Sequence, residues 1–253
     1  MEKRKIVEIK DLSKVFNDES RGEVKAVNGV TFNCYEGEVF GLLGPNGAGK
    51  TTTLRMISTL MTPTKGDIII NGYNTKNDPD NVRKSMGFMS TTTALYPRLT
   101  PREILSYFCS LNSYPNEKIS ERVNEIISYF NIGDYADTHS EKLSTGMKQI
   151  TSIGRSLVHN PSLVVLDEPN SGLDVINAIK IQKYIRKIAE SGKTVLFSSH
   201  NMGEVEKICD RIGIISKGEL LAIGTLEELR EMSGKHYMED IFVHFVEKKE
   251  QEN

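Results

Sequence analysis

The sequence predicts an α/β protein built around a mostly parallel β-sheet. Three short apolar runs, at residues 39–43, 163–166 and 195–198, show no alternation of polar and apolar side chains. This pattern is typical of strands that are buried on both faces. A segment of helical character follows each run, and strands that alternate with helices form parallel sheets covered by helices on both sides.

The first hundred residues mix strands with one helix. Stretches rich in β-branched residues predict strands, and a polar, glycine-bearing stretch at 17–23 predicts an exposed loop. A glycine-rich turn after residue 43 leads into a helical segment. The additional strands that we expect here are residues 6–9, 24–32 and 67–70.

Residues 92–160 are mostly helical in character and predict an inserted helical subdomain. Its first helix begins with Thr100-Pro101-Arg102-Glu103, a capping box with proline at the first helical position. We expect two more helices in this segment, at 118–130 and from about residue 144 to 159.

Strand and helix alternate again after residue 160. Val175–Glu190 and residues 201–208 predict helices, and residues 212–216 with 219–223 predict a hairpin. We assign residues 1–233 to one domain and residues 234–253 to a separate tail. In the tail, apolar residues at helical spacing predict a short amphipathic helix: Met238, Ile241, Phe242 and Phe245.

The composition excludes several classes of protein. The chain has 253 residues and a formal charge of −2, so a binder of nucleic-acid backbones is not expected. No apolar run reaches the roughly 18 residues of a membrane span, and the N-terminus lacks the apolar stretch of a signal peptide. Cys34, Cys109 and Cys209 fit neither a disulfide framework nor a metal pattern, and we interpret them as reduced cytosolic thiols.

Residues 44–51 fit the phosphate-loop pattern G-x-x-x-x-G-K-[ST]. Glycines let backbone N–H groups point inward around phosphate oxygens, and the following helix N-terminus adds favourable partial charge. Lys50 would reach the β- and γ-phosphates, and the Thr51 hydroxyl would ligate Mg²⁺. A chance glycine-rich turn is the alternative, which the preceding strand and the following helix disfavour. The residues expected to bind nucleotide are Gly44, Pro45, Asn46, Gly47, Ala48, Gly49, Lys50, Thr51 and Thr52.

Two further strand ends carry side chains suited to phosphate chemistry. Asp167 and Glu168 follow the run at 163–166, where Asp167 suits Mg²⁺ and Glu168 suits a general base for water. His200 follows the run at 195–198 and could contact a γ-phosphate, because ligands gather at the carboxyl ends of parallel strands. Taken alone, the carboxylates also fit an ordinary charged loop, and the histidine also fits a structural role.

The segment LSTGMKQ opens a helix that Ser144 can cap, which by itself indicates only an ordinary capped helix. The combination of motifs is more specific. In order, the chain carries GPNGAGKT, LSTGMKQ, LVVLDEP, SGLD and the later His200. Over about residues 6–229 this set resembles the nucleotide-binding subunit of an ATP-binding cassette (ABC) transporter.

The resemblance implies a fold, a reaction and an assembly. The fold is a RecA-like P-loop NTPase core with an N-terminal antiparallel β-subdomain and an inserted helical subdomain. The reaction is hydrolysis of ATP with Mg²⁺. The assembly is a head-to-tail dimer, for which two identical chains suffice because the motifs are intact. It energises a separate integral membrane subunit from the cytoplasmic face of the cell membrane.

The resemblance also assigns roles to residues. Glu168 falls on the family's catalytic glutamate and His200 on its switch histidine. Phe16 falls on the aromatic residue that stacks on adenine, although a phenylalanine at a strand end also fits a structural role. The signature loop, which contacts ATP bound to the opposite subunit, is Ser144, Thr145, Gly146 and Met147. The D-loop, which contacts the opposite subunit, is Ser171, Gly172, Leu173 and Asp174.

Two positions depart from the family pattern. Thr91 stands where the family usually has a glutamine that contacts Mg²⁺ or water, and the shorter side chain would make that contact through water. The signature is S-T-G-M in place of S-G-G-Q, so Thr145 adds bulk beside the retained Gly146.

The subfamily pattern is similar to one type of exporter. STGM together with ALYPRLTPRE is similar to the sodium-efflux (NatA-like) type of bacterial ABC ATPase, and antibiotic-export ATPases share parts of the pattern. A soluble ATP switch acting on DNA or ribosomes is the alternative from another class. It is disfavoured because the chain carries neither a long inserted coiled coil nor a second cassette.

Overall fold

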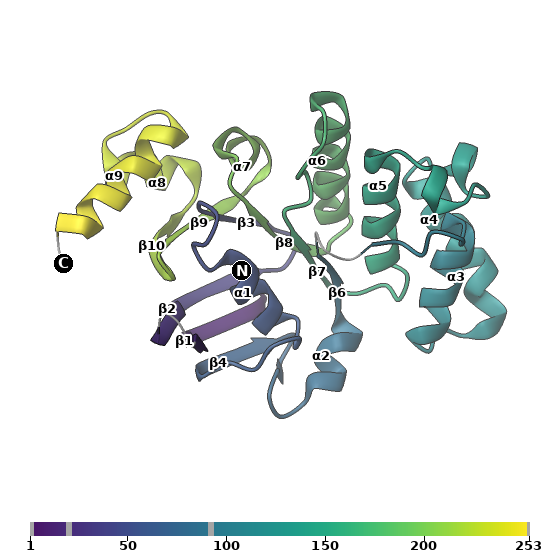
Figure 1. Ribbon diagram of the computed structural model, residues 1–253, viewed down its shortest axis with the longest axis horizontal. Coiled ribbons are helices and arrows are strands. Elements are labelled where there is room, and N and C mark those ends of the chain that lie inside the picture. The colour runs from purple at the N-terminus through teal and green to yellow at the C-terminus, as the bar shows by residue number, and fades with distance from the viewer. Residues whose placement is uncertain (1–2, 19–21, 91–93, 252–253) are drawn as a thin grey trace.

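The computed structural model describes residues 3–18, 22–90 and 94–251, which form two β-sheets flanked by helices (Figure 1). The larger sheet has six strands in the order β10-β9-β3-β8-β7-β6. All of its neighbouring strands run parallel except β10, which returns antiparallel to β9. Its strands are β3 (Val39–Leu43), β6 (Met86–Met89), β7 (Leu163–Asp167), β8 (Thr194–Ser199), β9 (Arg211–Ser216) and β10 (Glu219–Gly224). The predicted parallel α/β sheet is confirmed.

The central strands of this sheet are buried along their whole length. Every residue of β3, β7 and β8 is buried, which explains why the sequence shows no alternation there. Leu43 pairs in register with Ser199, and Asp167 pairs with Ser198. The residues that follow these three strands therefore meet at one edge of the sheet.

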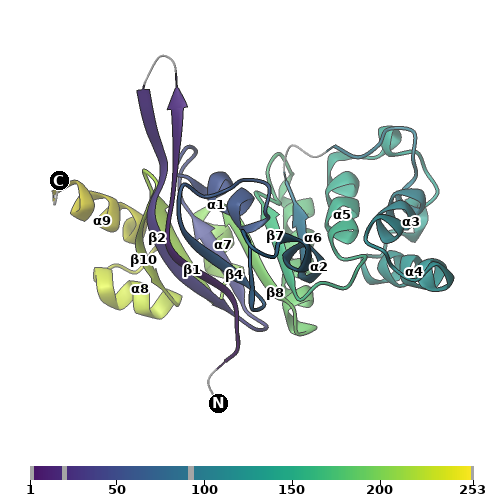
Figure 2. The same cartoon turned by 90° about the horizontal axis from the view of Figure 1, so that it is seen from below.

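The smaller sheet is antiparallel, as expected for the N-terminal β-subdomain. Its order is β2-β1-β4-β5, and β1 and β2 form a long hairpin whose far end projects beyond the helices (Figure 2). The loop expected at residues 17–23 was predicted too long at both ends, because the pairing of β1 with β2 continues as far as Asp18 and Gly22. Register shifts between Ile9 and Val15 interrupt the alternation that would have revealed the full strand. The strands are β1 (Lys5–Asp18), β2 (Gly22–Tyr35), β4 (Lys65–Ile70) and β5 (Tyr73–Asn74).

Helix α1 (Lys50–Ile57) packs between the two sheets. Its Leu54, Met56 and Ile57 are fully buried in a core that also takes side chains from both sheets, including Phe40 of β3 and Ile9 of β1. Some residues of β3, β7 and β8 belong to this core. Those that alternate with them along the strands face a second core, which they form with the helices on the opposite face of the larger sheet. The start of α1, and with it the phosphate loop, is therefore held by packing from both sides.

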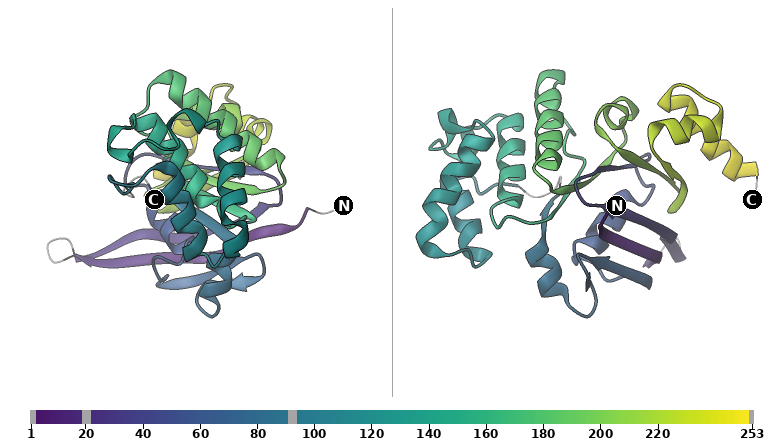
Figure 3. Two further views of the ribbon diagram at one scale, coloured as in Figure 1. Left: turned by 90° about the vertical axis from the view of Figure 1, so that its right-hand side faces the viewer. Right: turned by 180° about the vertical axis from the view of Figure 1, so that it is seen from behind.

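The helices predicted for residues 92–160 lie at one end of the larger sheet (Figure 3). Thr100 and Glu103 form the expected capping box, in which each side chain accepts a hydrogen bond from the backbone N–H of the other. The helices are α3 (Pro101–Leu111), α4 (Ile119–Tyr129) and α5 (Thr145–Ser156).

The remaining helices include two that the sequence pattern did not indicate, α2 (Pro79–Ser85) and α8 (Leu226–Ser233). The predicted helices after residue 170 are present as α6 (Val175–Glu190), α7 (Met202–Ile208) and α9 (Met238–Gln251). The stripe of α9 is buried against its own chain, where α9 packs on α7, α8 and β10. None of the helices in the described ranges is long and apolar enough to cross a membrane.

Candidate active site

The phosphate loop, residues 44–49, joins β3 to α1 and closes around the Lys50 ammonium group. Lys50 is 5% exposed, and its Nζ donates hydrogen bonds of 2.6 Å to the Gly44 carbonyl and 3.1 Å to the Pro45 carbonyl. Gly49 has a φ of +100°, and a Cβ there would lie 2.5 Å from the Ala26 carbonyl oxygen. Only glycine fits this approach of the loop to β2.

A cavity of about 510 Å³ opens beside this loop. Most of the predicted nucleotide-binding residues line it, whereas Gly44 and Ala48 are buried and take no part in the lining. Ala26 of β2 is a lining residue that carried no signal in the sequence. The lining consists of Ala26, Pro45, Asn46, Gly47, Gly49, Lys50, Thr51, Thr52, Glu168, Ser171 and His200.

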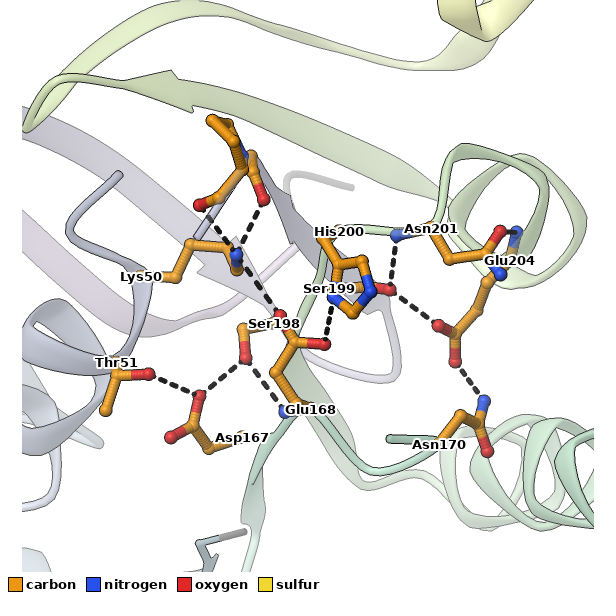
Figure 4. Close-up of polar contacts among 12 residues, drawn as sticks. Lys50, Thr51, Asp167, Glu168, Asn170, Ser198, Ser199, His200, Asn201 and Glu204 are labelled. Atoms are coloured by element: carbon orange, nitrogen blue, oxygen red, sulfur yellow. Dashed lines mark hydrogen bonds and ion pairs between the residues drawn. The ribbon is translucent and has the colours of Figure 1, made fainter. Parts of the chain in front are cut away.

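The ends of β7 and β8 place Asp167 against the start of α1. The Asp167 Oδ1 atom accepts hydrogen bonds of 3.1 Å from Thr51 Oγ1 and 2.7 Å from Ser198 Oγ (Figure 4). Its Oδ2 atom is buried and has no hydrogen-bond partner within residues 3–18, 22–90 and 94–251. A buried carboxylate oxygen without a partner, next to a threonine hydroxyl, is a donor set that fits a hard cation such as Mg²⁺.

Glu168 meets both of the other predicted catalytic side chains. Its Oε1 lies 3.2 Å from Lys50 Nζ, and its Oε2 lies 2.8 Å from His200 Nδ1. The backbone of Glu168 adopts a φ of +49°, which is unusual for a residue other than glycine, and its N–H donates a 2.9 Å bond to Ser198 Oγ. The structure therefore brings Lys50, Glu168 and His200 together at the edge of the cavity.

The comparisons with known proteins agree with this geometry. Residues 27–171 match the sequence profile of the family described as "ABC transporter". The chain belongs to the ABC transporter family. It is 37% identical over 239 residues to the ABC transporter ATP-binding protein NatA of Bacillus subtilis (strain 168), covering 94% of this chain and 97% of that protein. It is 39% identical over 208 residues to the linearmycin resistance ATP-binding protein LnrL of the same organism, covering 82% of this chain and 67% of LnrL.

A solved structure supports the same assignment. The ATP-binding cassette MJ0796, in a dimeric post-hydrolysis state bound to ADP and Pi, superposes with a TM-score of 0.77 at 28% identity, covering 87% of this chain and 98% of that one. As a member of the ABC transporter family, the chain is an ATP-binding subunit of an ABC transporter and an ATPase.

The predicted signature segment, Ser144 to Met147, is not part of the cavity lining. Ser144 caps α5 by accepting a 3.3 Å bond from the Met147 N–H, and both Ser144 and Thr145 are exposed. Gly146 is buried, and a Cβ there would lie 2.7 Å from Asn177 Cγ of α6. Within the described chain, none of residues 144–147 lines the cavity.

The predicted D-loop, Ser171 to Asp174, connects the cavity to α6. Ser171 lines the cavity, whereas Gly172 and Asp174 are exposed outside it. Asp174 caps α6 by accepting bonds of 3.0 Å from the Asn177 N–H and 2.6 Å from Asn177 Nδ2, which lower the pKa of the Asp174 carboxyl.

Two predicted residues are not part of the assembled site. Phe16 lies on β1, is 38% exposed, and has the Lys14 ammonium 5.3 Å from its ring centre. It pairs in register with Val24, two residues before the lining residue Ala26, and it does not itself line the cavity in the described chain. Thr91 lies outside the described residues.

Sequence reasoning missed a buried carboxyl next to this site. Glu204 of α7 is 4% exposed, and it accepts hydrogen bonds from Ser199 and Asn170. Burial raises the pKa of Glu204, and the negative charge of Glu168 raises it further, while the two hydrogen bonds oppose the shift. The spacing of Asn201 and Glu204 is typical of a capping box, and Asn201 does cap α7 by accepting from the Glu204 N–H.

Proposed function

We propose that two copies of this chain bind ATP between them and hydrolyse it to drive a separate membrane subunit that exports sodium ions. The observation that carries the hydrolytic part is the meeting of Lys50, Glu168 and His200 at the edge of a cavity large enough for a nucleoside triphosphate. In this proposal residues 1–233 form the ATPase domain, and residues 234–253 form a structural tail.

The phosphate loop binds the nucleotide in this proposal. Apart from Pro45, which has no backbone N–H, the lining residues of the loop and of the start of α1 offer backbone N–H groups to the phosphates: Asn46, Gly47, Gly49, Lys50, Thr51 and Thr52. Lys50 bonds to two carbonyls of its own loop, and the phosphate oxygens, which carry full charge, are stronger acceptors for the ammonium group. The exposed ring of Phe16 stacks on the adenine.

Thr51 and Asp167 would hold Mg²⁺, because Asp167 presents a buried carboxylate oxygen without a partner in the described chain. When bound, Mg²⁺ neutralises charge on the phosphate oxygens. Thr91, which stands at the family's glutamine position, would act through water.

Glu168 acts as the general base for the attacking water. Both of its carboxylate oxygens are occupied, one by Lys50 and the other by His200. The γ-phosphate attracts both of these groups and so frees the carboxylate to accept a proton. The water oxygen then bonds to the γ-phosphorus as the bond to the β–γ bridging oxygen breaks, which gives ADP and phosphate.

The second copy supplies the groups that one chain does not place at its own cavity. The signature residues Ser144, Thr145, Gly146 and Met147 sit at a capped helix N-terminus, which attracts phosphate, yet they do not line the cavity in the described chain. The D-loop residues Ser171, Gly172, Leu173 and Asp174 leave the cavity toward an exposed surface. The similar cassette MJ0796 is dimeric when bound to ADP and Pi, which supports the same arrangement here.

Sodium efflux at the inner face of the cell membrane is supported by the end-to-end match to NatA, 97% of which is covered. Antibiotic export is the second candidate, because the identity to LnrL is 39% over a shorter span. Vesicles that hold this chain with its membrane subunit separate the two. ATP-dependent movement of ²²Na⁺ supports sodium efflux, and movement of linearmycin without ²²Na⁺ supports antibiotic export.

The Glu168→Gln variant tests the hydrolytic part. We expect ATP binding to stay within about threefold of wild type, turnover to fall by about 100-fold or more, and an ATP-bound dimer to accumulate. The measurements are ATP titration, phosphate release and the mass in solution with ATP. Turnover equal to that of wild type would contradict the assignment of Glu168 as the base.

A further inference from the structure

A buried carboxyl joins the two strand ends that carry Glu168 and His200. The Glu204 Oε2 atom accepts a 2.6 Å hydrogen bond from Ser199 Oγ, and its Oε1 atom accepts a hydrogen bond from Asn170 Nδ2 (Figure 4). We call Ser199, Glu204 and Asn170 the Glu204 clamp. In the described chain, none of these three residues lines the cavity.

The two partners of Glu204 are close neighbours of the reacting groups along the chain. Ser199 directly precedes His200, and Asn170 follows Glu168 after one proline. In Figure 4, Glu204 and Lys50 lie on opposite sides of the contact between Glu168 and His200. The clamp therefore holds the two strand ends on the side away from the phosphate loop.

The direct contact between Glu168 and His200 cannot keep these groups in place during turnover. The His200 side chain is 52% exposed, and in the proposed mechanism the γ-phosphate draws both His200 and Lys50 from Glu168. The hydrogen bonds of the clamp involve no group that the phosphate contacts, so they persist while the direct contact is exchanged. Because Glu204 is buried, its bonds also face little competition from water.

We propose that Glu204 is a positioning residue for ATP hydrolysis, which holds Asn170 and Ser199 so that Glu168 and His200 keep their relative places as the γ-phosphate replaces their direct contact. This inference rests on the proposed roles of Glu168 and His200.

The clamp is anchored at both ends. The Asn201 N–H donates a 3.0 Å bond to Ser199 Oγ, and the Asn201 side chain accepts from the Glu204 N–H at 3.2 Å. At the other end, Gln149 Nε2 of α5 donates a 2.6 Å bond to the carbonyl of Pro169, the residue before Asn170. The segment that Glu204 holds is therefore also tied to the helix that begins with the signature segment.

The Glu204→Ala variant tests the proposal by steady-state hydrolysis of Mg-ATP by the full chain. We expect kcat to fall about tenfold to 100-fold, because a shift of the order of 1 Å in a catalytic group has such an effect. The KM for ATP should change by less than about threefold, because the phosphate loop and Lys50 are untouched. Glu204→Gln should restore most of kcat, because its amide can accept from Asn170 and donate to Ser199.

Glu206→Ala is the matched control. Glu206 lies on the same helix, and its carboxylate pairs with Arg230 of α8 at 2.9 Å, away from the clamp. This variant loses a carboxylate and an ion pair of α7, so it reports the effect of a weakened helix alone. We expect its kcat to equal that of wild type.

The outcomes separate this proposal from the one on which it rests. A Glu204→Ala variant that melts at a lower temperature but keeps the wild-type kcat would show a structural role only and would overturn the proposal. If Glu204→Ala does not fold, Asn170→Ala, which removes one bond of the clamp, must lower kcat without raising KM, and an unchanged kcat overturns the proposal. A wild-type chain that binds ATP without hydrolysing it would overturn both the proposed hydrolytic function and the positioning role of Glu204. The Glu168→Gln variant tests only whether Glu168 is the general base.

Discussion

The cavity side and the signature side of the proposed ATP site are built differently. On the cavity side, Lys50, Asp167 and Glu168 are largely buried, and all of their polar contacts come from the same chain. Lys50 pairs with Glu168, Asp167 accepts from Thr51, and the Glu168 N–H donates to Ser198. On the signature side, Ser144 and Thr145 are exposed, and Ser144 contributes the side-chain cap to the N-terminus of α5. One side is complete within a single chain, whereas the other presents a surface suited to a second molecule.

This difference separates two effects that mutations usually mix. Removing one partner from a buried polar network leaves the other without compensation, which costs stability and function together. Changing an exposed group in the first turn of a helix, other than the cap itself, leaves the fold nearly intact. Variants on the cavity side should therefore disturb the binding or the hydrolysis of ATP, and variants on the signature side should disturb the assembly of two chains while ATP binding by one chain is kept.

The largest effect is expected for Lys50→Ala on the cavity side. Its ammonium is the buried cation that faces the phosphates, and its loss also leaves Glu168 Oε1 without the ion pair at 3.2 Å. We expect ATP to bind about 100-fold more weakly or worse, measured by calorimetric titration. Lys65→Ala is the control, since this lysine is exposed and pairs only with Asp11 in the described chain. If Lys50→Ala bound ATP within about threefold of wild type, the cavity would not be the nucleotide site.

The residues on the cavity side were predictable because their signal is local. Asp167, Glu168 and His200 lie at or directly after the end of an apolar strand, and Lys50 belongs to the glycine-rich pattern that follows a third one. Parallel strands bring their carboxyl ends to one edge of the sheet. Glu204 was not predictable in this way, because its role comes from contacts with Asn170 and Ser199 that only the packing of α7 on the sheet creates. A sequence pattern identifies Glu204 as a capping residue at most.

The elements of the fold were likewise predictable where their signal is local. The buried strands β3, β7 and β8 match their predicted bounds to within one residue at each end. The hairpin of β1 and β2 was predicted too short, because register shifts break its alternation. Strand β6 has the sequence Met-Gly-Phe-Met, without β-branched residues, and α8 buries only Leu229 and Ser233, so neither shows a strong periodic signal. The Thr225–Glu228 capping box of α8 was a usable signal that hydrophobic periodicity overlooked.

A smaller effect is expected for Thr145→Glu on the signature side. An acidic residue in the first turn of a helix is favourable for the helix, so α5 should remain stable, but the added charge opposes a phosphate of the second molecule. In the Glu168→Gln background we expect ATP-dependent dimerisation to weaken about tenfold, with ATP binding by the single chain unchanged. Sedimentation at a series of protein concentrations measures the dimer, and the same background carrying Ser120→Glu, an exposed site in the first turn of α4, is the control. If the two variants dimerise equally, the signature segment does not face ATP.

The smallest effect is expected from pH, and it has opposite signs for the buried carboxyl of Glu204 and the exposed carboxyl of Asp174. Burial raises the pKa of Glu204, so the folded state gains stability from this carboxyl below its ordinary pKa near 4.5 and loses it as the pH rises through the raised value. Hydrogen bonds from Asn177 lower the pKa of Asp174, so its contribution is present above its ordinary pKa near 3.8 and is lost as the pH falls through the lowered value. From pH 3 to pH 7, the melting temperature of wild type should therefore fall relative to Glu204→Gln and rise relative to Asp174→Asn. We expect changes of about a few degrees in thermal melts followed by circular dichroism. Two differences that change in the same direction with pH would contradict the contrast between the buried carboxyl of Glu204 beside the cavity and the exposed, hydrogen-bonded carboxyl of Asp174 in the predicted D-loop.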